Sequence, residues 1–172
     1  MNRCFWITGL PGAGKTTLAK AFQNRLKQLG INAIYLDGDE LRYILGKTNS
    51  HYSKADRLKL AKTYARLCQT LSLQGHFVIC ATVSMFDEVR KWNRLNIPQY
   101  IEVFVDVPNN ILNIRNQKGL YSNQDQQLPG QSQEIELPSS PDYCFLNDNT
   151  KPVEFFVDKL IQPLNLRTKN EN

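Results

Sequence analysis

The sequence lacks the long apolar runs, cysteine pairs and histidine clusters that mark several classes of protein. No apolar run approaches the roughly 18 residues that a membrane-spanning helix needs, and no cleavage-site pattern follows the initial MNRCFWITGL. The four cysteines show no C-x-x-C spacing, and the two histidines are too few and too far apart for a zinc site. We therefore expect a cytoplasmic protein with free thiols.

Positive charge is only slightly in excess, with a formal net charge of +5. The 172 residues include 21 Lys and Arg and 16 Asp and Glu, with no dense basic run interleaved with aromatic residues. This pattern argues against nucleic acid as a partner and fits a small anionic ligand. The length predicts a single domain over residues 1–165, and we expect the polar tail 166–172 to be disordered.

Five short apolar runs alternate with stretches of helical periodicity. The runs show little polar alternation, which is typical of strands covered on both faces. The alternation of strands and helices predicts right-handed βαβ units and an α/β fold of three layers, with a mainly parallel five-stranded sheet flanked by helices. The expected strands are Cys4–Thr8, Ala33–Leu36, Phe77–Thr82, Ile101–Asp106 and Tyr143–Leu146, and the expected helices are Gly14–Leu29, Ser53–Leu73, Met85–Leu95, Pro108–Asn116 and Pro152–Leu164.

Two features lie outside this simple alternation. Ser53 and Ser84 each stand three residues before an aspartate, which predicts a capping box at the start of two helices. The segment 116–141 is rich in Gln, Ser, Pro and Gly and is too long for an ordinary connection. It is either a polar lid over a ligand, which we favour, or a surface loop.

The stretch GLPGAGKTT has the spacing G-x-x-x-x-G-K-T and lies between an apolar run and a helical stretch. In this context the glycines let backbone N–H groups turn inward around a polyphosphate, at the N-terminus of the following helix. Lys15 would bridge the β- and γ-phosphates, and Thr16 would hold Mg²⁺. The motif predicts a P-loop NTPase fold with ATP and Mg²⁺ as cofactors.

The stretch IYLDGDELR places Asp37 and Asp39 on either side of a glycine at the end of an expected strand. The pattern alone fits a simple turn. In a parallel sheet, however, the strands end at the edge where ligands bind, so both carboxylates would emerge beside the γ-phosphate. One could accept the proton of an attacking hydroxyl and the other could order Mg²⁺, without the residues showing which does which. A short chain with these features and without an N-K-x-D motif is typical of a small-molecule kinase.

Five motifs, in order and with similar spacing, resemble the adenylyl-sulfate kinase family: FWITGLPGAGKTTLA, LDGDELR, YSKADR, YIEVFVDVP and RNQKGLY. The resemblance runs from about Arg3 to Tyr121. Members of this family phosphorylate the ribose 3′-hydroxyl of adenosine 5′-phosphosulfate with MgATP. The resemblance therefore implies an ATP-dependent phosphotransferase with a small nucleotide as its substrate.

The resemblance also implies roles for individual residues. ATP would be bound by Gly9, Gly12, Ala13, Gly14, Lys15, Thr16, Thr17 and Arg115, and the metal by Thr16 and Asp39. The acceptor would be bound by Asp39, Arg42, Tyr52, Arg57, Lys62, Ser84, Lys118, Gly119, Leu120 and Tyr121. Catalysis would rest on Lys15, Asp37, Asp39 and Lys118.

The departures from the family pattern lie on the acceptor side. Leu60, Lys62 and Thr63 stand where the family has an asparagine and an arginine among its acceptor contacts, and Asp87 stands where it has an arginine. An Arg-to-Asp change beside an anion is unfavourable unless another cation, such as Arg90, compensates. The leading hypothesis is adenosine 5′-phosphosulfate as acceptor. The alternatives are another 5′-substituted nucleotide, such as the cytidine diphosphoramidate of capsular polysaccharide biosynthesis, some other small acceptor such as a sugar acid or a nucleoside, or a non-catalytic nucleotide-binding protein.

The sequence does not establish an oligomeric state. The family often forms dimers, so a homodimer is one expectation, and Trp92 is an apolar residue that could lie exposed at such an interface.

Overall fold

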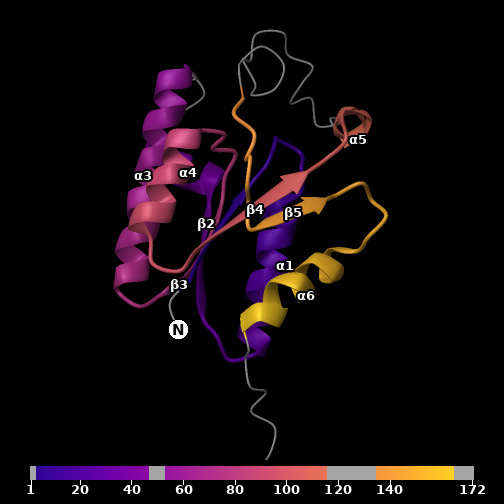
Figure 1. Ribbon diagram of the computed structural model, residues 1–172, viewed down its shortest axis with the longest axis horizontal. Helices are drawn as coiled ribbons and strands as arrows, with labels where there is room; N and C mark the ends of the chain where they lie inside the picture. Colours follow the sequence, from indigo (N-terminus) through magenta and orange to yellow (C-terminus); the bar gives the residue numbers. More distant parts are fainter. Residues whose placement is uncertain (1–2, 47–52, 116–134, 165–172) are drawn as a thin grey trace, which may run out of the picture.

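The computed structural model describes residues 3–46, 53–115 and 135–164 of the chain. Its centre is a five-stranded sheet in the order β2-β3-β1-β4-β5, with every neighbouring pair parallel (Figure 1). The strands are β1 Cys4–Thr8, β2 Ala33–Asp37, β3 Phe77–Ala81, β4 Tyr100–Asp106 and β5 Tyr143–Leu146. All five expected strands are confirmed, with ends that differ by at most one residue.

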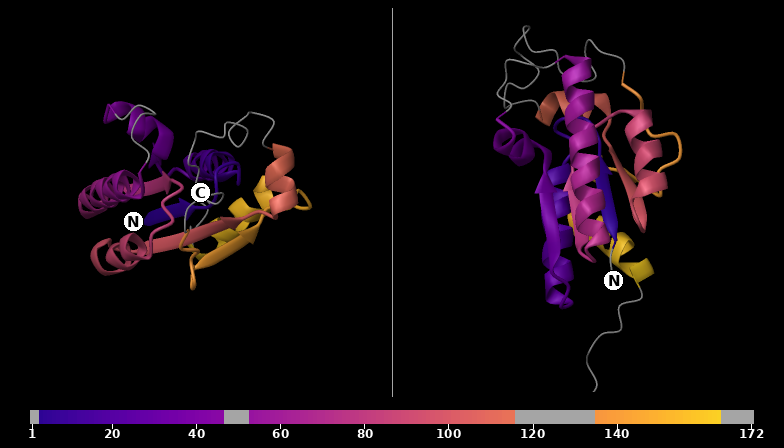
Figure 2. Two further views of the ribbon diagram at one scale, coloured as in Figure 1. Left: turned by 90° about the horizontal axis from the view of Figure 1, so that it is seen from above. Right: turned by 90° about the vertical axis from the view of Figure 1, so that its left-hand side faces the viewer.

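Helices cover both faces of the sheet, which gives the expected three layers (Figures 1 and 2). One face carries α1 Lys15–Gln28 and α6 Val153–Ile161, and α6 continues into the 3-10 helix η2 Gln162–Leu164. The other face carries α3 Lys54–Leu73 and α4 Asp87–Asn96. Two short helices, α2 Gly38–Ile44 and α5 Asn109–Arg115, follow β2 and β4 at the carboxyl edge of the sheet.

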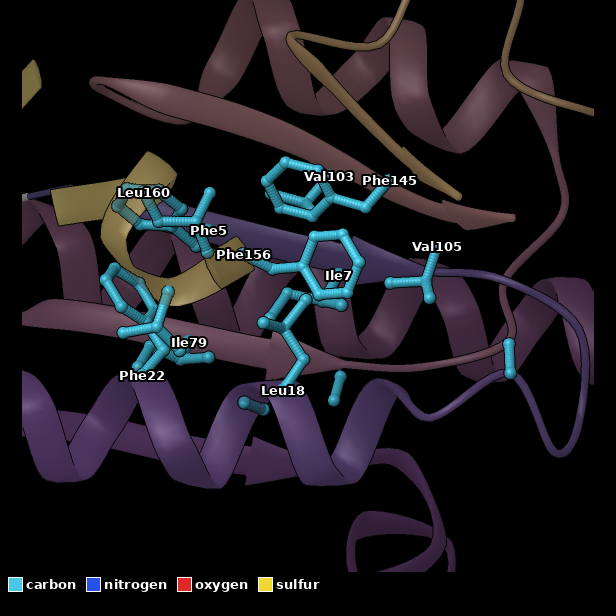
Figure 3. Close-up of a cluster of buried hydrophobic side chains, with 14 of the residues drawn as sticks. Phe5, Ile7, Leu18, Phe22, Ile79, Val103, Val105, Phe145, Phe156 and Leu160 are labelled. Carbon is cyan, nitrogen blue, oxygen red and sulfur yellow. The ribbon is translucent and has the colours of Figure 1, made fainter. Parts of the chain in front are cut away.

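Strand β1 shows why the apolar runs do not alternate. All five of its residues are buried, because successive side chains point to opposite faces and both faces are covered. Phe5 and Ile7 belong to the core under α1 and α6, whereas Cys4 and Trp6 belong to the core under α3 and α4. Figure 3 shows the first of these cores, in which the ring of Phe5 lies 4.8 Å from that of Phe22 of α1.

Helix α2 was not expected from the sequence. Its N-cap is Asp37, whose side chain accepts a hydrogen bond from the Asp39 N–H. The glycine between the two aspartates is needed for close approach, because a Cβ on Gly38 would lie 3.2 Å from both the Ala81 carbonyl oxygen and the Thr82 hydroxyl. The Asp-Gly-Asp stretch is therefore a helix start pressed against the end of β3.

The two predicted capping boxes have different outcomes. Ser53 is the N-cap of α3 and accepts a hydrogen bond from the Asp56 N–H at 3.1 Å, as predicted. Ser84 is not an N-cap: α4 begins at Asp87 with Phe86 in the cap position, so this prediction is wrong. The Asp87 N–H instead donates to a carboxylate oxygen of Glu136, 2.6 Å away, from a segment far along the chain. A distant side chain thus satisfies a group that local sequence was expected to satisfy.

Two further expectations concern the surface. Within the described residues, no helix is long and apolar enough to cross a membrane. Trp92 is half-buried and packs against the core under α3 and α4, so it is not the exposed apolar residue that the sequence suggested.

Candidate active site

The P-loop joins β1 to α1 at the carboxyl edge of the sheet, as its sequence spacing predicts. Gly14 is the N-cap of α1 and has a φ of 95°, a left-handed conformation that favours glycine. The Lys15 ammonium donates a hydrogen bond to the Leu10 carbonyl at 2.8 Å and so spans the loop. Burial lowers the pKa of Lys15 to about 8, although Asp39 and Asp37 act in the opposite direction. Because the buried ammonium has lost much of its hydration, a bound phosphate would stabilise its charged form.

Asp37 is held firmly at the end of β2. Its carboxylate accepts hydrogen bonds from the Tyr35 hydroxyl at 2.5 Å, the Asp39 N–H at 2.9 Å and the Thr16 hydroxyl at 3.1 Å. Burial raises the pKa of Asp37, but these hydrogen bonds outweigh it and hold the pKa of the carboxyl below its usual value. The contact with Thr16 brings the second strand and the P-loop together, as the parallel topology predicted.

Asp39 lies in a different environment, although it is only two residues away. Its side chain is 86% exposed and forms an ion pair with Arg42 at 3.2 Å within the first turns of α2. The two carboxylates therefore differ in what they can do. Asp37 is fixed by three donors, whereas Asp39 is largely exposed and forms its described ion pair with Arg42 on the same helix.

The segment between β3 and α4 forms another wall of the site. The Thr8 hydroxyl, just before the P-loop, donates to the Val83 carbonyl at 2.9 Å, and a Cβ added to Gly38 would lie 3.2 Å from the Thr82 hydroxyl oxygen. The segment thus lies between the P-loop and the start of α2. Ser84, predicted to bind the acceptor, is buried here.

Three carboxylates gather at the start of α4, and each forms an ion pair with a Lys or Arg. Asp87 and Glu88 lie in its first turn, and the Glu136 carboxylate caps its N-terminus. Arg90 does not provide a cation toward the site, because its buried guanidinium forms ion pairs with Asp87 and with Glu102, the latter at 3.4 Å. The sequence suggested that Arg90 could replace the missing cation beside the acceptor. Instead, Arg90 pairs with Asp87 on its own helix and with Glu102 of β4.

The other predicted acceptor residues have varied positions. Lys62 forms an ion pair with Glu88 at 2.9 Å, across the space between α3 and α4. Arg57 is half-buried in the first turns of α3, on the same side of the molecule. Five predicted residues fall outside the described residues: Tyr52, Lys118, Gly119, Leu120 and Tyr121. Of the predicted lid, only 135–141 is described, and there the Leu137 carbonyl accepts from Arg90 at 3.4 Å and the Ser140 carbonyl from Arg94 at 3.0 Å.

On the other side of the P-loop lies a cavity of about 320 Å³. Four of the residues that line it were predicted to bind ATP: Gly12, Gly14, Thr17 and Arg115. The sequence analysis did not identify the other lining residues, which are Leu18, Val105, Phe145, Asn147, Lys151, Val153 and Phe156. Arg115 extends from α5 toward the loop, and its Nη1 donates to the Gly12 carbonyl at 3.4 Å. The apolar floor of the cavity is part of the core shown in Figure 3.

Several residues that build the site were missed by the sequence analysis. Tyr35 holds Asp37 and could have been found, because side chains two residues apart on a strand share a face. Tyr64 of α3 donates to the Gly38 carbonyl at 3.1 Å, and it lies inside the expected helix Ser53–Leu73 with no motif to distinguish it. Asn147 directly follows β5 at the ligand edge, which is a usable signal. Glu136 gave no signal, because it lies in an irregular polar segment.

The three-layer parallel sheet, the P-loop and the carboxylates after the second strand define a P-loop kinase. Comparison with known proteins narrows this class. The profile of the adenylylsulphate kinase family matches residues 1–145, most of the chain. The chain belongs to the adenylylsulphate kinase family and is a phosphotransferase, so the non-catalytic alternative is set aside.

Individual relatives carry two different names. The chain is 43% identical over 117 residues to a cytidine diphosphoramidate kinase of Campylobacter jejuni, which covers 68% of each protein. It is 36% identical over 151 residues to an adenylyl-sulfate kinase of Deinococcus deserti, 86% of this chain and 83% of the relative. Among solved structures, the Mycobacterium tuberculosis APS kinase CysC in complex with AMPPNP and APS matches with a TM-score of 0.84 and 28% identity, over 95% of this chain and 97% of the other.

Proposed function

We propose that the protein transfers the γ-phosphoryl group of ATP to the ribose 3′-hydroxyl of a nucleotide that bears a substituent on its 5′-phosphate. The observation that carries this proposal is the contact between Thr16 of the P-loop and Asp37 of β2, 3.1 Å apart. It puts the donor loop and the acidic pair in one site. The structural neighbour that binds both AMPPNP and APS supports the same arrangement of donor and acceptor.

The residues divide the work as follows. Thr16 and Asp37 present hydroxyl and carboxylate oxygens, the ligands that Mg²⁺ prefers, so they fit the metal better than the predicted pair of Thr16 and Asp39. A bound Mg²⁺ would offset negative charge on the donor phosphates. Asp39, exposed and anchored by Arg42, is the group that accepts the proton of the 3′-hydroxyl. Lys15 stabilises charge on the transferring phosphoryl group.

The hydrogen-bond acceptors at the start of α4 favour cytidine diphosphoramidate as the acceptor over adenosine 5′-phosphosulfate. A terminal sulfate only accepts hydrogen bonds, whereas a terminal phosphoramidate also carries an amino group that donates them. The carboxylates of Asp87 and Glu136 can accept hydrogen bonds from that amino group, which a sulfate cannot offer, and Arg90 is already engaged with Asp87. The 43% identity to a cytidine diphosphoramidate kinase supports the same choice. Adenosine 5′-phosphosulfate is the second candidate, supported by the family profile and by the adenylyl-sulfate kinase relatives.

An ADP-release assay with MgATP tests the proposal when the two acceptors are compared at matched concentrations. We expect a higher kcat/KM with cytidine diphosphoramidate. A higher kcat/KM with adenosine 5′-phosphosulfate would reverse the order of the two candidates. Binding of ATP without turnover of either compound would contradict both acceptors.

A further inference from the structure

Asn147 connects three parts of the donor side of the site. Its side-chain Nδ2 donates to the Ala13 carbonyl of the P-loop at 2.8 Å, and its backbone N–H donates to the Asp106 carbonyl at the end of β4, also at 2.8 Å. Its Oδ1 accepts from Nη2 of Arg115 at 3.2 Å. Because β5 runs parallel to β4, the residue that leaves β5 reaches the edge where the P-loop lies.

The fit between Asn147 and the loop is close. A Cβ added to Gly14 would lie 2.7 Å from Nδ2 of Asn147, so the amide occupies the space that a side chain at that position would need. A trans peptide is planar, and its carbonyl and its N–H point in opposite directions. By holding the Ala13 carbonyl, Asn147 therefore also sets the direction of the Gly14 N–H on the other side of the same peptide.

Arg115 adds a second contact to the same loop. Its Nη1 donates to the Gly12 carbonyl at 3.4 Å, while its Nη2 contacts the Asn147 carbonyl at 3.4 Å and the side chain of Asn149. Asn147 and Arg115 together thus hold two consecutive carbonyls of the P-loop. Both also line the 320 Å³ cavity.

We propose that Asn147 is a positioning residue for the donor polyphosphate. It acts through the Ala13–Gly14 peptide, which it holds in the orientation that lets the loop receive phosphate, and it links this peptide to Arg115. The alternative role for a polar residue that lines this cavity is direct contact with the nucleotide base. The two roles differ in what happens to a ligand that has phosphates and no base.

Inorganic tripolyphosphate is such a ligand, and its binding can be compared with that of ATP by calorimetry in the presence of Mg²⁺. The first variant is Asn147→Leu, which keeps the approximate shape of the side chain without a hydrogen-bond donor. The second is Asn147→Ala, which tests the same loss if the first variant does not fold. We expect both to bind ATP and tripolyphosphate about 3- to 10-fold more weakly, the loss that one hydrogen bond represents. We expect no change in the preference for ATP over GTP or CTP.

Thr150→Ala is the matched control, because Thr150 lies in the same connection and its described hydrogen bonds go to Asp148, not to the P-loop or Arg115. It should leave the affinity for tripolyphosphate within about twofold of the parent value. Loss of ATP affinity in the Asn147 variants with unchanged tripolyphosphate binding would overturn the proposal in favour of base contact. Unchanged binding of both ligands would also overturn it. Neither measurement uses an acceptor, so the result does not depend on which nucleotide the protein phosphorylates.

Discussion

The two sides of the site are built in different ways. On the donor side, side chains hold backbone carbonyls of the P-loop: Lys15 holds Leu10, Asn147 holds Ala13 and Arg115 holds Gly12. On the acceptor side, side chains hold one another as ion pairs, such as Asp39 with Arg42 and Lys62 with Glu88. The backbone of the P-loop can bind phosphate whatever its side chains are, whereas a single substitution removes an ion pair. In this chain, therefore, single substitutions can alter the ion pairs while the backbone contacts of the P-loop stay in place.

Replacement of Asp39 by asparagine should have the largest effect and should separate the two sides. Loss of a general base typically costs 10²- to 10⁴-fold in rate, and among the described residues Asp39 acts on the P-loop only through its charge near Lys15, with no hydrogen bond or ion pair to it. We therefore expect turnover to fall by about that factor while the Kd for MgATP changes little. Single-turnover rates and ATP binding by calorimetry give the two numbers.

Asp37→Asn is the informative partner of that variant. Asp37 contacts Thr16, so its replacement should weaken binding of MgATP as well as lower the rate. If Asp39→Asn weakened MgATP binding more than Asp37→Asn did, the proposed division between metal ligand and base would be wrong.

Reversing charge at the start of α4 should change the acceptor preference without affecting the donor. In Asp87→Arg the carboxylate next to Arg90 is replaced by a cation, and in Glu136→Gln the cap of α4 becomes neutral. Changes of this kind near an anion are typically worth a few kcal/mol. We expect the ratio of kcat/KM for adenosine 5′-phosphosulfate to that for cytidine diphosphoramidate to rise about 10- to 100-fold in the double variant.

The matched control is Glu154→Gln, a neutralised carboxylate in the first turn of α6, on the opposite face of the sheet. It should leave the ratio unchanged. An unchanged ratio in the Asp87 and Glu136 variants would mean that these carboxylates do not face the acceptor.

The sequence predicted the donor side of the site better than the acceptor side. The strands, the P-loop and the position of Asp37 were predicted, because each depends on local pattern or on the rule that parallel strands end at one edge. Helix α2 was missed, since its start looked like a turn and its N-cap is a residue assigned to catalysis. The cap of α4 could not be predicted, because Glu136 reaches it from 49 residues away.

The pH dependence of ATP binding should report on the donor side alone. In the free protein, burial lowers the pKa of Lys15 to about 8. Bound phosphate favours the charged amine, so the pKa should rise on binding. Binding should therefore take up a proton above about pH 8, and affinity should fall as the pH rises through that range, by at most tenfold per unit.

Calorimetry in two buffers with different heats of ionisation measures this proton. With a pKa of about 8, Lys15 is about three quarters deprotonated at pH 8.5, so we expect an uptake of up to about 0.75 proton there and less than about 0.1 at pH 6.5. Arginine keeps its charge throughout this range, so the uptake should disappear in Lys15→Arg. Uptake at pH 8.5 that persisted in Lys15→Arg would assign the proton to a different group.

The smallest expected effect concerns the two serines for which the sequence predicted the same role. Ser53 caps α3 through the Asp56 N–H, and loss of such a cap typically costs about 1 kcal/mol. Ser84 makes no cap, and its buried hydroxyl has no hydrogen-bond partner among the described residues, so its removal takes no hydrogen bond from the folded state. Urea unfolding should show Ser53→Ala destabilised by about 1 kcal/mol and Ser84→Ala within about 0.5 kcal/mol of the parent or more stable. A loss of about 1 kcal/mol in Ser84→Ala would mean that its hydroxyl has a hydrogen-bond partner in solution. Ser84 could then cap α4, as the sequence analysis predicted.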